Sequence, residues 1–360
     1  MGIRGKGIKV IAFYLPQFHP IAENDEWWGK GFTEWTNVGK TKPLFKGHYQ
    51  PRVPADLGYY DLRMPETREA QAELARYCGI EGFAYWHYWF GGKRLLERPF
   101  NEVLASGSPT LPFCLAWANE SWSGIWNNQP GRILIEQVYP GLDDNIAHFF
   151  ENLAAFSDKR YIRIDGRPVF FIYRPFGLTN PHEFMECWNT LAVKNNLDEF
   201  YFIGFTRKKS EIGKILELGF DAVNIVGITD AKKKISLIKN TIVSGLGKYF
   251  GGYGALSIWE YEDIIANWVT EDYYREEIIP SLYPNWDNSP RSGRRGFIVN
   301  NSNPILFEKH IRELIKTVEN KKNKILFLKS WNEWAEGNYV EPDLAFGLGY
   351  IEALRKNLIK

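Results

Sequence analysis

The sequence predicts a single (β/α)8 barrel, an α/β fold of eight parallel strands alternating with helices. Three observations lead to this prediction. Short apolar runs alternate with amphipathic stretches, no repeat or linker interrupts them, and 360 residues suit a barrel with extended βα loops. A doubly wound open sheet is the alternative. However, the first apolar run leads into Tyr14-Leu-Pro-Gln rather than the glycine-rich phosphate loop usual in that fold.

Eight apolar runs are short enough, and bounded clearly enough, to be buried strands. They cover residues 8–14, 82–89, 112–118, 169–173, 200–205, 222–226, 278–283 and 325–330. Asp165-Gly166 adds a hairpin signal just before the fourth run.

Amphipathic stretches between these runs predict the helices. They cover residues 65–78, 98–105, 143–156, 181–195, 261–269, 304–320 and 346–358, with Asp143 as a plausible N-cap. Residues 229–254, with five lysines and several glycines, break the pattern. We expect them to form an irregular insertion in one catalytic domain that spans residues 1–360.

Composition narrows the function classes. A net charge of +1 gives no electrostatic argument for a nucleic-acid partner. Cys78, Cys114 and Cys187 are far apart, which fits neither a disulfide framework nor a zinc site. Without a signal-peptide pattern or a transmembrane-length apolar run, the sequence predicts a soluble cytoplasmic protein. Aromatic residues form 16% of the chain, more than a core needs, so some should line a cleft.

The segment from Leu328 to Gly337 is the most informative one. It places Glu333 and Glu336 three residues apart, just after the last predicted strand, with tryptophans before each of them. Cleavage of a glycosidic bond needs one carboxyl group that donates a proton and one that stays ionised. Sugar rings also pack well on aromatic faces. The alternative is a pair of solvated glutamates at the start of the last helix.

Barrel enzymes build their sites where strands end, and six predicted strand ends couple an aromatic with a hydrogen-bonding group. The catalytic candidates are Glu333 and Glu336; the substrate-binding candidates are Gln17, His19, Trp35, Tyr85, His87, Trp117, Asn119, Glu120, Tyr173, Trp286, Asp287, Trp331, Asn332 and Trp334. Two of the acidic candidates, Glu120 and Asp287, have alternative roles. Glu120 could pair with Glu333 across the barrel, and Asp287 could be only a turn residue.

His19 and His87 show no metal-ligand spacing, so substrate contact and a buried hydrogen-bonded role are equally plausible for them. No metal and no cofactor are expected. The basic run from Arg291 to Gly296 reads better as a solvated loop than as a phosphate contact.

Several of these motifs resemble one family. They are Tyr14-Leu-Pro-Gln-Phe-His-Pro, Asn24 through Val38, Ala116-Trp-Ala-Asn-Glu, Pro284 through Arg291, Trp331-Asn-Glu-Trp-Ala-Glu-Gly and Glu341-Pro. The sequence is similar, over nearly its whole length, to WbsX-like proteins. That resemblance implies a (β/α)8 barrel encoded in loci for O-antigen or capsular polysaccharide. Such proteins are commonly labelled glycosyltransferases of lipopolysaccharide or polysaccharide biosynthesis, yet they are similar to endo-α-mannosidases of glycoside hydrolase family 99.

By resemblance to those mannosidases, Glu333 matches the residue that deprotonates the sugar 2-hydroxyl, and Glu336 matches the general acid/base. The resemblance implies retention of anomeric configuration, which the spacing of the two glutamates allows without proving. The expected activity is that of a retaining endo-acting glycoside hydrolase or transglycosidase. A glycosyltransferase that uses an activated donor is the alternative, and a non-catalytic carbohydrate-binding barrel is a third class.

The expected partner is an oligo- or polysaccharide, either free or lipid-linked. The lysines of residues 229–254 interleave with apolar side chains and could make a peripheral contact with an anionic membrane, although a basic barrel helix is favoured.

Overall fold

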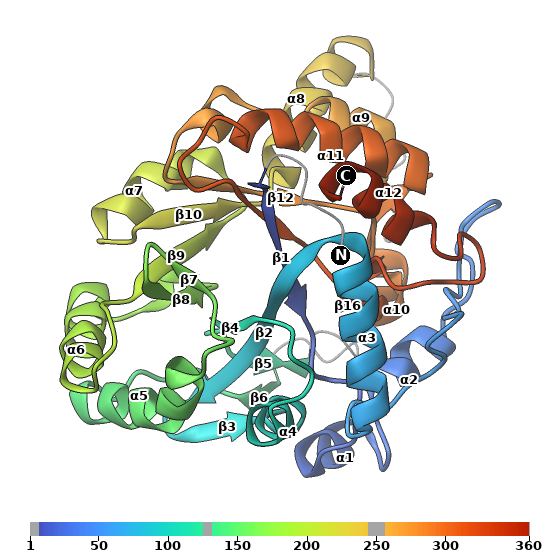
Figure 1. The fold of residues 1–360 in the computed structure, drawn as a ribbon. Coiled ribbons are helices and arrows are strands. Elements are labelled where there is room, and N and C mark those ends of the chain that lie inside the picture. Colours follow the sequence, from blue (N-terminus) through green and yellow to red (C-terminus); the bar gives the residue numbers. More distant parts are fainter. Residues whose placement is uncertain (1–6, 125–131, 244–255, 360) are drawn as a thin grey trace.

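The computed structural model describes residues 7–124, 132–243 and 256–359. Eight parallel strands form a closed ring, in which β1 pairs with β2 on one side and with β15 on the other. Helices surround the ring (Figure 1). The predicted (β/α)8 barrel is therefore confirmed.

Each barrel strand lies within two residues of its predicted bounds. In spatial order they are β1 (Lys9–Tyr14), β2 (Ile80–Phe90), β4 (Phe113–Trp117), β8 (Arg167–Ile172), β9 (Tyr201–Thr206), β10 (Ala222–Ile225), β12 (Ile278–Leu282) and β15 (Ile325–Leu328). The predicted hairpin is also present, because β7 (Arg163–Ile164) pairs antiparallel with the start of β8.

The helices that cover the barrel are α3 (Pro65–Cys78), α4 (Arg98–Ser106), α5 (Leu142–Ser157), α6 (Pro181–Lys194), α7 (Ile212–Glu217), α8 (Ile228–Val243), α9 (Tyr261–Ala266), α11 (Pro304–Val318) and α12 (Gly349–Leu358). Sequence patterns did not predict α7. For residues 229–243 the expectation of an irregular insertion is wrong, and the favoured alternative, a basic barrel helix, is what the structure has. Helix α8 takes up the first part of the lysine-rich segment, and residues 244–254 lie outside the described residues. The prediction of Asp143 as N-cap is wrong: Gly141 is the cap, and Asp143 lies in the first turn, where its charge still favours the helix dipole.

Aromatic rings fill the barrel interior. The ring of Phe13 on β1 stacks on Trp86 of β2 at 4.7 Å and on Phe327 of β15 at 4.9 Å. Phe171 of β8 meets Phe13 from across the barrel, with ring centroids 4.9 Å apart. Since side chains alternate along a strand, Trp86 points inward and its neighbours Tyr85 and His87 point outward.

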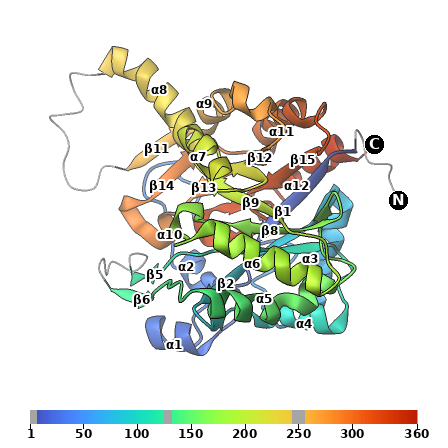
Figure 2. The ribbon, with the colours of Figure 1, turned by 90° about the vertical axis from the view of Figure 1, so that its left-hand side faces the viewer.

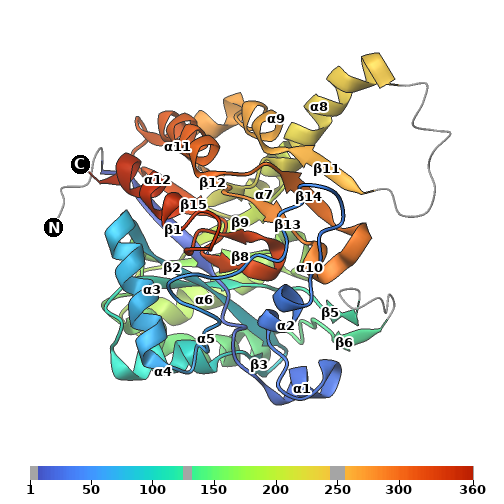
Figure 3. The ribbon, with the colours of Figure 1, turned by 90° about the vertical axis from the view of Figure 1, so that its right-hand side faces the viewer.

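The short remaining elements belong to loops after the barrel strands. They are α1 (Ala22–Trp28), α2 (Glu34–Gly39), β3 (Lys93–Leu95), β5 (Trp122–Ser123), β6 (Ile133–Ile135), β11 (Ser257–Glu260), β13 (Trp286–Asp287), α10 (Ser289–Ser292), β14 (Phe297–Asn300), β16 (Asn332–Glu333) and β17 (Asn338–Tyr339). Figures 2 and 3 show α1, α10 and the β5–β6 hairpin at the end of the barrel opposite the two chain termini. This end carries the carboxyl ends of the strands.

Candidate active site

The two candidate glutamates lie on a compact turn that follows β15. Residues 332–333 form β16 and pair antiparallel with residues 338–339 of β17. Between them, Trp334–Glu336 form a single 3-10 turn, and Gly337 ends it in the left-handed conformation. One continuous loop therefore sets the relative position of both carboxyl groups, which hydrogen-bond to each other.

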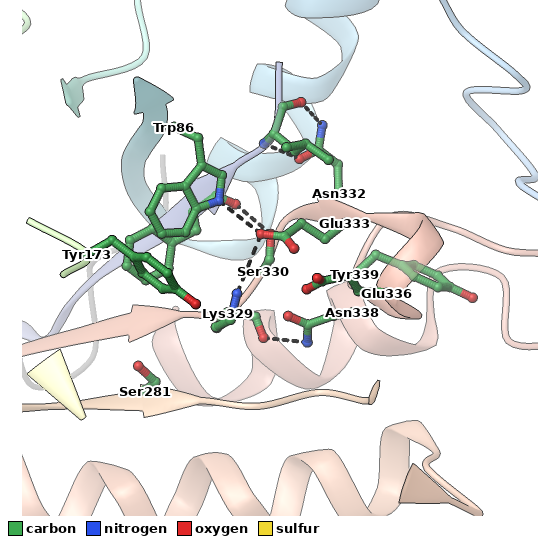
Figure 4. Close-up of polar contacts among 12 residues, drawn as sticks. Trp86, Tyr173, Ser281, Lys329, Ser330, Asn332, Glu333, Glu336, Asn338 and Tyr339 are labelled. Carbon is green, nitrogen blue, oxygen red and sulfur yellow. Dashed lines mark hydrogen bonds and ion pairs between the residues drawn. The ribbon is translucent and has the colours of Figure 1, made fainter. Parts of the chain in front are cut away.

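Glu333 is buried and surrounded by donors. Its Oε1 accepts a hydrogen bond from Trp86 Nε1 at 2.9 Å and lies 3.5 Å from Lys329 Nζ (Figure 4). Burial works against ionisation of Glu333. The charge of Lys329 and the hydrogen bond from Glu336 outweigh burial, with help from Arg291 and Trp86, and hold the pKa of Glu333 well below its usual range.

Glu336 experiences the opposite balance. Burial is the largest effect and the charge of Glu333 adds to it, so the pKa of Glu336 is raised well above its usual range. Arg291 Nη1 contacts Glu336 Oε1 at 2.7 Å but only partly offsets this rise. At neutral pH the pair therefore holds one proton, on Glu336, beside an ionised Glu333. Such a split pair is what acid and base roles require.

Arg291 connects three loops, those that follow β1, β12 and β15. Its Nε and Nη2 lie 3.1 Å and 3.0 Å from Glu34 Oε2, while its Nη1 binds Glu336. Glu34 begins α2 and Arg291 lies in α10. Because the Arg291 guanidinium contacts both Glu34 and Glu336, its orientation is fixed. Glu336 is therefore stabilised less by this charge than it would be if Arg291 contacted Glu336 alone.

A cavity of about 480 Å³ opens above the pair. Its lining combines aromatic rings with charged groups of both signs. The lining residues are Leu15, Gln17, Trp28, Phe32, Glu34, Asn37, Trp86, Tyr88, Ala118, Glu120, Ser121, Trp122, Ser123, Leu134, Tyr173, Arg174, Arg207, Trp286, Asn288, Arg291, Lys329, Glu333 and Glu336. Aromatic faces beside hydrogen-bonding groups suit a sugar, whose C–H faces and hydroxyls need both.

The structure brings six of the sixteen candidate site residues together around this cavity: Gln17, Glu120, Tyr173, Trp286, Glu333 and Glu336. Asn119 lies in the neighbouring cavity, where its amide bonds to Tyr139 and to the backbone of Arg174. Glu120 is partly exposed and forms an ion pair with Arg174 at 2.5 Å. The partner of Glu333 is Glu336, not Glu120.

Other candidates lie behind the cavity wall and hold the candidate catalytic turn, which is residues 332–339. Trp331 and Trp334 donate from their indole nitrogens to Glu341, at 2.9 Å and 2.6 Å. Asn332 bonds to both the backbone N–H and the carbonyl of Leu15, which fixes β16 to the end of β1. These contacts position the candidate catalytic turn without facing the cavity.

Trp35 packs on Trp334 at 5.6 Å and donates to the backbone of Tyr60. Asp287 is buried and accepts hydrogen bonds from His48 and Gln50, each at 2.7 Å. Both residues therefore join loops rather than line the cavity.

The outward-facing candidates contact the helical layer. Tyr85 packs on Phe100 of α4, and His87 lies 2.7 Å from His148 of α5. Trp117 also packs on His148. His19 is fully buried, and burial lowers its pKa to about 4. None of the four lines the cavity.

Several residues that line the cavity were missed from sequence. Trp86 and Tyr88 sit at alternate positions of β2, beside the outward residues chosen instead. Lys329 follows β15 directly, and Arg291 begins the run expected to be a solvated loop. That expectation is wrong for Arg291, whose side chain is 11% exposed. Trp86 could have been found by following the alternation of inward and outward positions along β2. Arg291 could have been found as the last residue of the family motif Pro284 through Arg291.

Within the described ranges, no three or more His, Cys, Asp or Glu side chains are grouped so that they could hold a metal ion. The described helices include none with the length and apolar character needed to cross a membrane.

Known proteins resemble this chain in sequence. The family model described as "Glycosyltransferase WbsX" matches residues 10–354. The uncharacterized protein WxcX of Xanthomonas campestris pv. campestris, in strains B100 and ATCC 33913, is 36% identical over 360 residues, which cover 98% of this chain and 50% of WxcX. The chain thus spans about half the length of these curated relatives.

Solved structures share the fold. A glycoside hydrolase-like protein has a TM-score of 0.61 at 15% identity, over 98% of this chain and 94% of its own. A GH99 endo-alpha-mannosidase from Bacteroides thetaiotaomicron, in complex with bis-tris propane, has a TM-score of 0.57 at 17% identity, over 97% and 94%. The family match runs from the first barrel strand into the last helix, and on that basis the chain belongs to the WbsX family.

Proposed function

We propose that this protein is a carbohydrate-active enzyme that cleaves or transfers a glycosidic bond with retention of configuration, using Glu333 and Glu336. The observation that carries the proposal is the split pair: two buried carboxyl groups in contact, one held ionised and one held protonated, at the base of an aromatic cavity. Retaining enzymes place their carboxyl groups close together, whereas inverting enzymes leave ~6.5–9.5 Å for a water molecule.

In the first step Glu336 gives its proton to the leaving oxygen as the bond from that oxygen to the anomeric carbon breaks. Glu333 takes the proton of the sugar 2-hydroxyl, whose oxygen attacks the anomeric carbon and forms a 1,2-anhydro sugar. The low pKa of Glu333 and the raised pKa of Glu336 supply the required protonation states. This use of Glu333 follows the resemblance to family 99 mannosidases.

In the second step Glu336, now ionised, takes a proton from water or from an acceptor hydroxyl that attacks the anomeric carbon. The three-membered ring opens, and its oxygen regains a proton from Glu333. Two successive inversions give net retention. Water as acceptor gives a hydrolase and a second glycan gives a transglycosidase.

We assign the substrate to a bacterial surface polysaccharide of the O-antigen or capsular type, met free or as a lipid-linked glycan at the cytoplasmic side of the membrane. The WbsX family membership supports this setting. The same family description supports a second candidate, a glycosyltransferase that uses an activated donor sugar in lipopolysaccharide biosynthesis.

The test compares Glu336→Gln and Glu333→Gln on surface polysaccharide of the host bacterium and on glycosyl fluorides. The Glu336→Gln variant should turn over polysaccharide ~10²–10⁴-fold more slowly than the wild type, because an amide cannot deliver a proton. A fluoride leaving group needs little protonation and should restore the first step for Glu336→Gln but not for Glu333→Gln.

Glu120→Gln is the matched control, because Glu120 lines the same cavity but pairs with Arg174. Near wild-type activity of both pair variants, with an inactive Glu120→Gln, would reject the assignment. Turnover only with a nucleotide-activated donor would favour the glycosyltransferase.

A further inference from the structure

The cavity at Glu333 and Glu336 continues into a second cavity of about 490 Å³. Five residues line both: Glu120, Ser121, Tyr173, Arg174 and Arg207. The two spaces therefore meet at the wall formed by the ends of β8 and β9, since Tyr173 and Arg207 directly follow these strands. A chain of sugars with one bond at the glutamate pair has room to extend in this direction.

Of the basic side chains described along this wall, some form ion pairs with carboxylates and one does not. Arg174 pairs with Glu120, and Lys208 pairs with Glu211 at 2.8 Å. Arg207, in contrast, has no carboxylate partner among the described residues; its Nη2 donates to the hydroxyl of Tyr173 at 3.1 Å.

Arg207 is half-buried and sits against the ring of Phe205, with its guanidinium carbon 5.8 Å from the ring centroid. The charges of Glu336 and Glu120 act on Arg207 from a distance and favour its charged form, but within the described part of the chain no carboxylate forms an ion pair with it. Its remaining N–H donors therefore face the shared wall of the two cavities, where an anion could accept from them. Five N–H donors in a planar fork match carboxylate and phosphate oxygens.

We propose that the substrate carries an anionic substituent, a sugar carboxylate or a sugar phosphate, which Arg207 binds at a subsite beside the glutamate pair. The hydroxyl of Tyr173 orients the guanidinium toward the shared part of the two cavities. This inference rests on the proposed function and adds to it the chemical class of the substrate. Arg207 then selects acidic polysaccharide over neutral polysaccharide.

The test uses the slowed Glu336→Gln protein and an array of matched oligosaccharides: neutral, uronate-bearing and phosphorylated members that share one backbone. Acidic members should bind ~10-fold or more tightly than their neutral counterparts, because hydrogen bonds to charged groups are worth about 1.5–3 kcal/mol. Added salt should reduce the difference. Comparing the uronate arm with the phosphate arm identifies the anion.

Arg207→Gln in the same background should remove the preference, and Arg207→Lys should keep part of it. Lys208→Gln is the matched control, because Lys208 is the next residue and already has a carboxylate partner. Equal binding of neutral and acidic members, no binding of any acidic member, or an equal loss in Lys208→Gln would each overturn the inference. Thermal melting of each variant checks that it is folded.

Failure here is distinct from failure of the proposed function. An Arg207-dependent preference together with undiminished turnover by Glu336→Gln would leave the subsite standing and reject the catalytic assignment. Turnover that depends on Glu336 without an acidic preference would do the reverse.

Discussion

Glu333 and Glu336 are the same side chain three residues apart, and their surroundings make them different. Glu333 receives an ammonium group and an indole N–H on one oxygen, while Glu336 shares its guanidinium with Glu34. Both carboxyl groups are buried, where charges and hydrogen-bond donors act more strongly than in water. Small differences in the neighbouring charged and donor groups therefore cause large differences in pKa. The division of roles is therefore set by the neighbours, above all by Lys329.

Lys329→Met tests this division. Loss of the ammonium leaves the effect of burial less opposed, so the pKa of Glu333 should rise by about one unit or more. The proposed mechanism needs Glu333 ionised, so under it activity is lost as pH falls through the pKa of Glu333. The acid limb of the kcat/KM profile should therefore move to higher pH in the variant.

The control is Lys316→Met, because Lys316 is exposed on α11 and pairs with Glu313. An unmoved acid limb in Lys329→Met would show that Lys329 does not set the ionisation of Glu333.

At this scale the sequence was a partial guide. The contact between Glu333 and Glu336 could be foreseen from their spacing on one turn after a buried strand. The two tryptophans beside them were expected to bind substrate, yet both donate to Glu341 behind the cavity wall. Choosing inward from outward residues on β2 failed, because Tyr85, Trp86, His87 and Tyr88 are aromatic on both faces. When both faces are aromatic, the period-two pattern loses the polarity contrast that normally tells them apart.

Among the elements, the candidate catalytic turn depends on close packing against β13. Gly337 has φ of 53°, and a Cβ built there would lie 2.8 Å from the backbone nitrogen of Asp287. Asp287 is itself held by His48 and Gln50. The turn therefore packs against the backbone of Asp287, which its hydrogen bonds hold in place.

Gly337→Ala should lower the free energy of unfolding by more than its conformational strain alone. A left-handed alanine costs ~1–2 kcal/mol, and overpacking adds ~1–3 kcal/mol. Gly107→Ala is a matched control: Gly107 is also left-handed, but a Cβ added there would meet nothing within 4 Å. Denaturant unfolding should show the larger loss for Gly337→Ala, with activity reduced only in that variant. Equal losses would argue against a packing role.

Most elements followed from local patterns. Apolar runs fixed the strands, and Pro at the start of α3 and α6 marked their first turns. Helix α7 is only six residues long, too short for a periodic pattern to stand out. For α8 the lysines left two interpretations open, an irregular insertion and a basic barrel helix, because their long stems are compatible with a helix even though they obscure its apolar face.

For the whole molecule, buried protonated carboxyl groups predict a pH-dependent stability. Burial raises the pKa of Glu341 to about 7 despite four hydrogen bonds, and burial with the charge of Glu333 raises that of Glu336. Between their unfolded and folded pKa values these two groups bind more protons in the native state than in the unfolded state, so their contribution to stability falls as pH rises. Burial lowers the pKa of His19, His87, His148 and His310, so these histidines oppose the trend below their ordinary pKa of about 6.5.

Above about pH 7 the histidines are neutral in both states, so the unfolding free energy should fall by about 1 kcal/mol between pH 7 and pH 8, at ~1.36 kcal/mol per unit of pKa shift. Glu336→Gln should weaken this dependence, since its amide does not titrate, whereas Glu313→Gln at an exposed ion pair should not. A flat profile for wild type, or the same slope in Glu336→Gln, would contradict the prediction.

The barrel could be foreseen at this scale, but the cavity could not. Barrel closure follows from eight parallel strands of buried composition. The cavity walls come from loops after β1, β2, β4, β8, β9, β12 and β15, and their mutual packing depends on pairs such as Glu34–Arg291, 257 positions apart. Nothing in local composition predicts such pairs.

Since both proposed catalytic carboxyl groups lie on one short turn, their separation does not depend on the barrel diameter. In a barrel that takes its two acids from different strands, any drift in strand tilt or packing alters the gap between them. Here the surrounding loops can be lengthened, shortened or exchanged without retuning the distance between acid and base. Over evolutionary time such an arrangement lets specificity diverge while the chemistry is inherited as a unit.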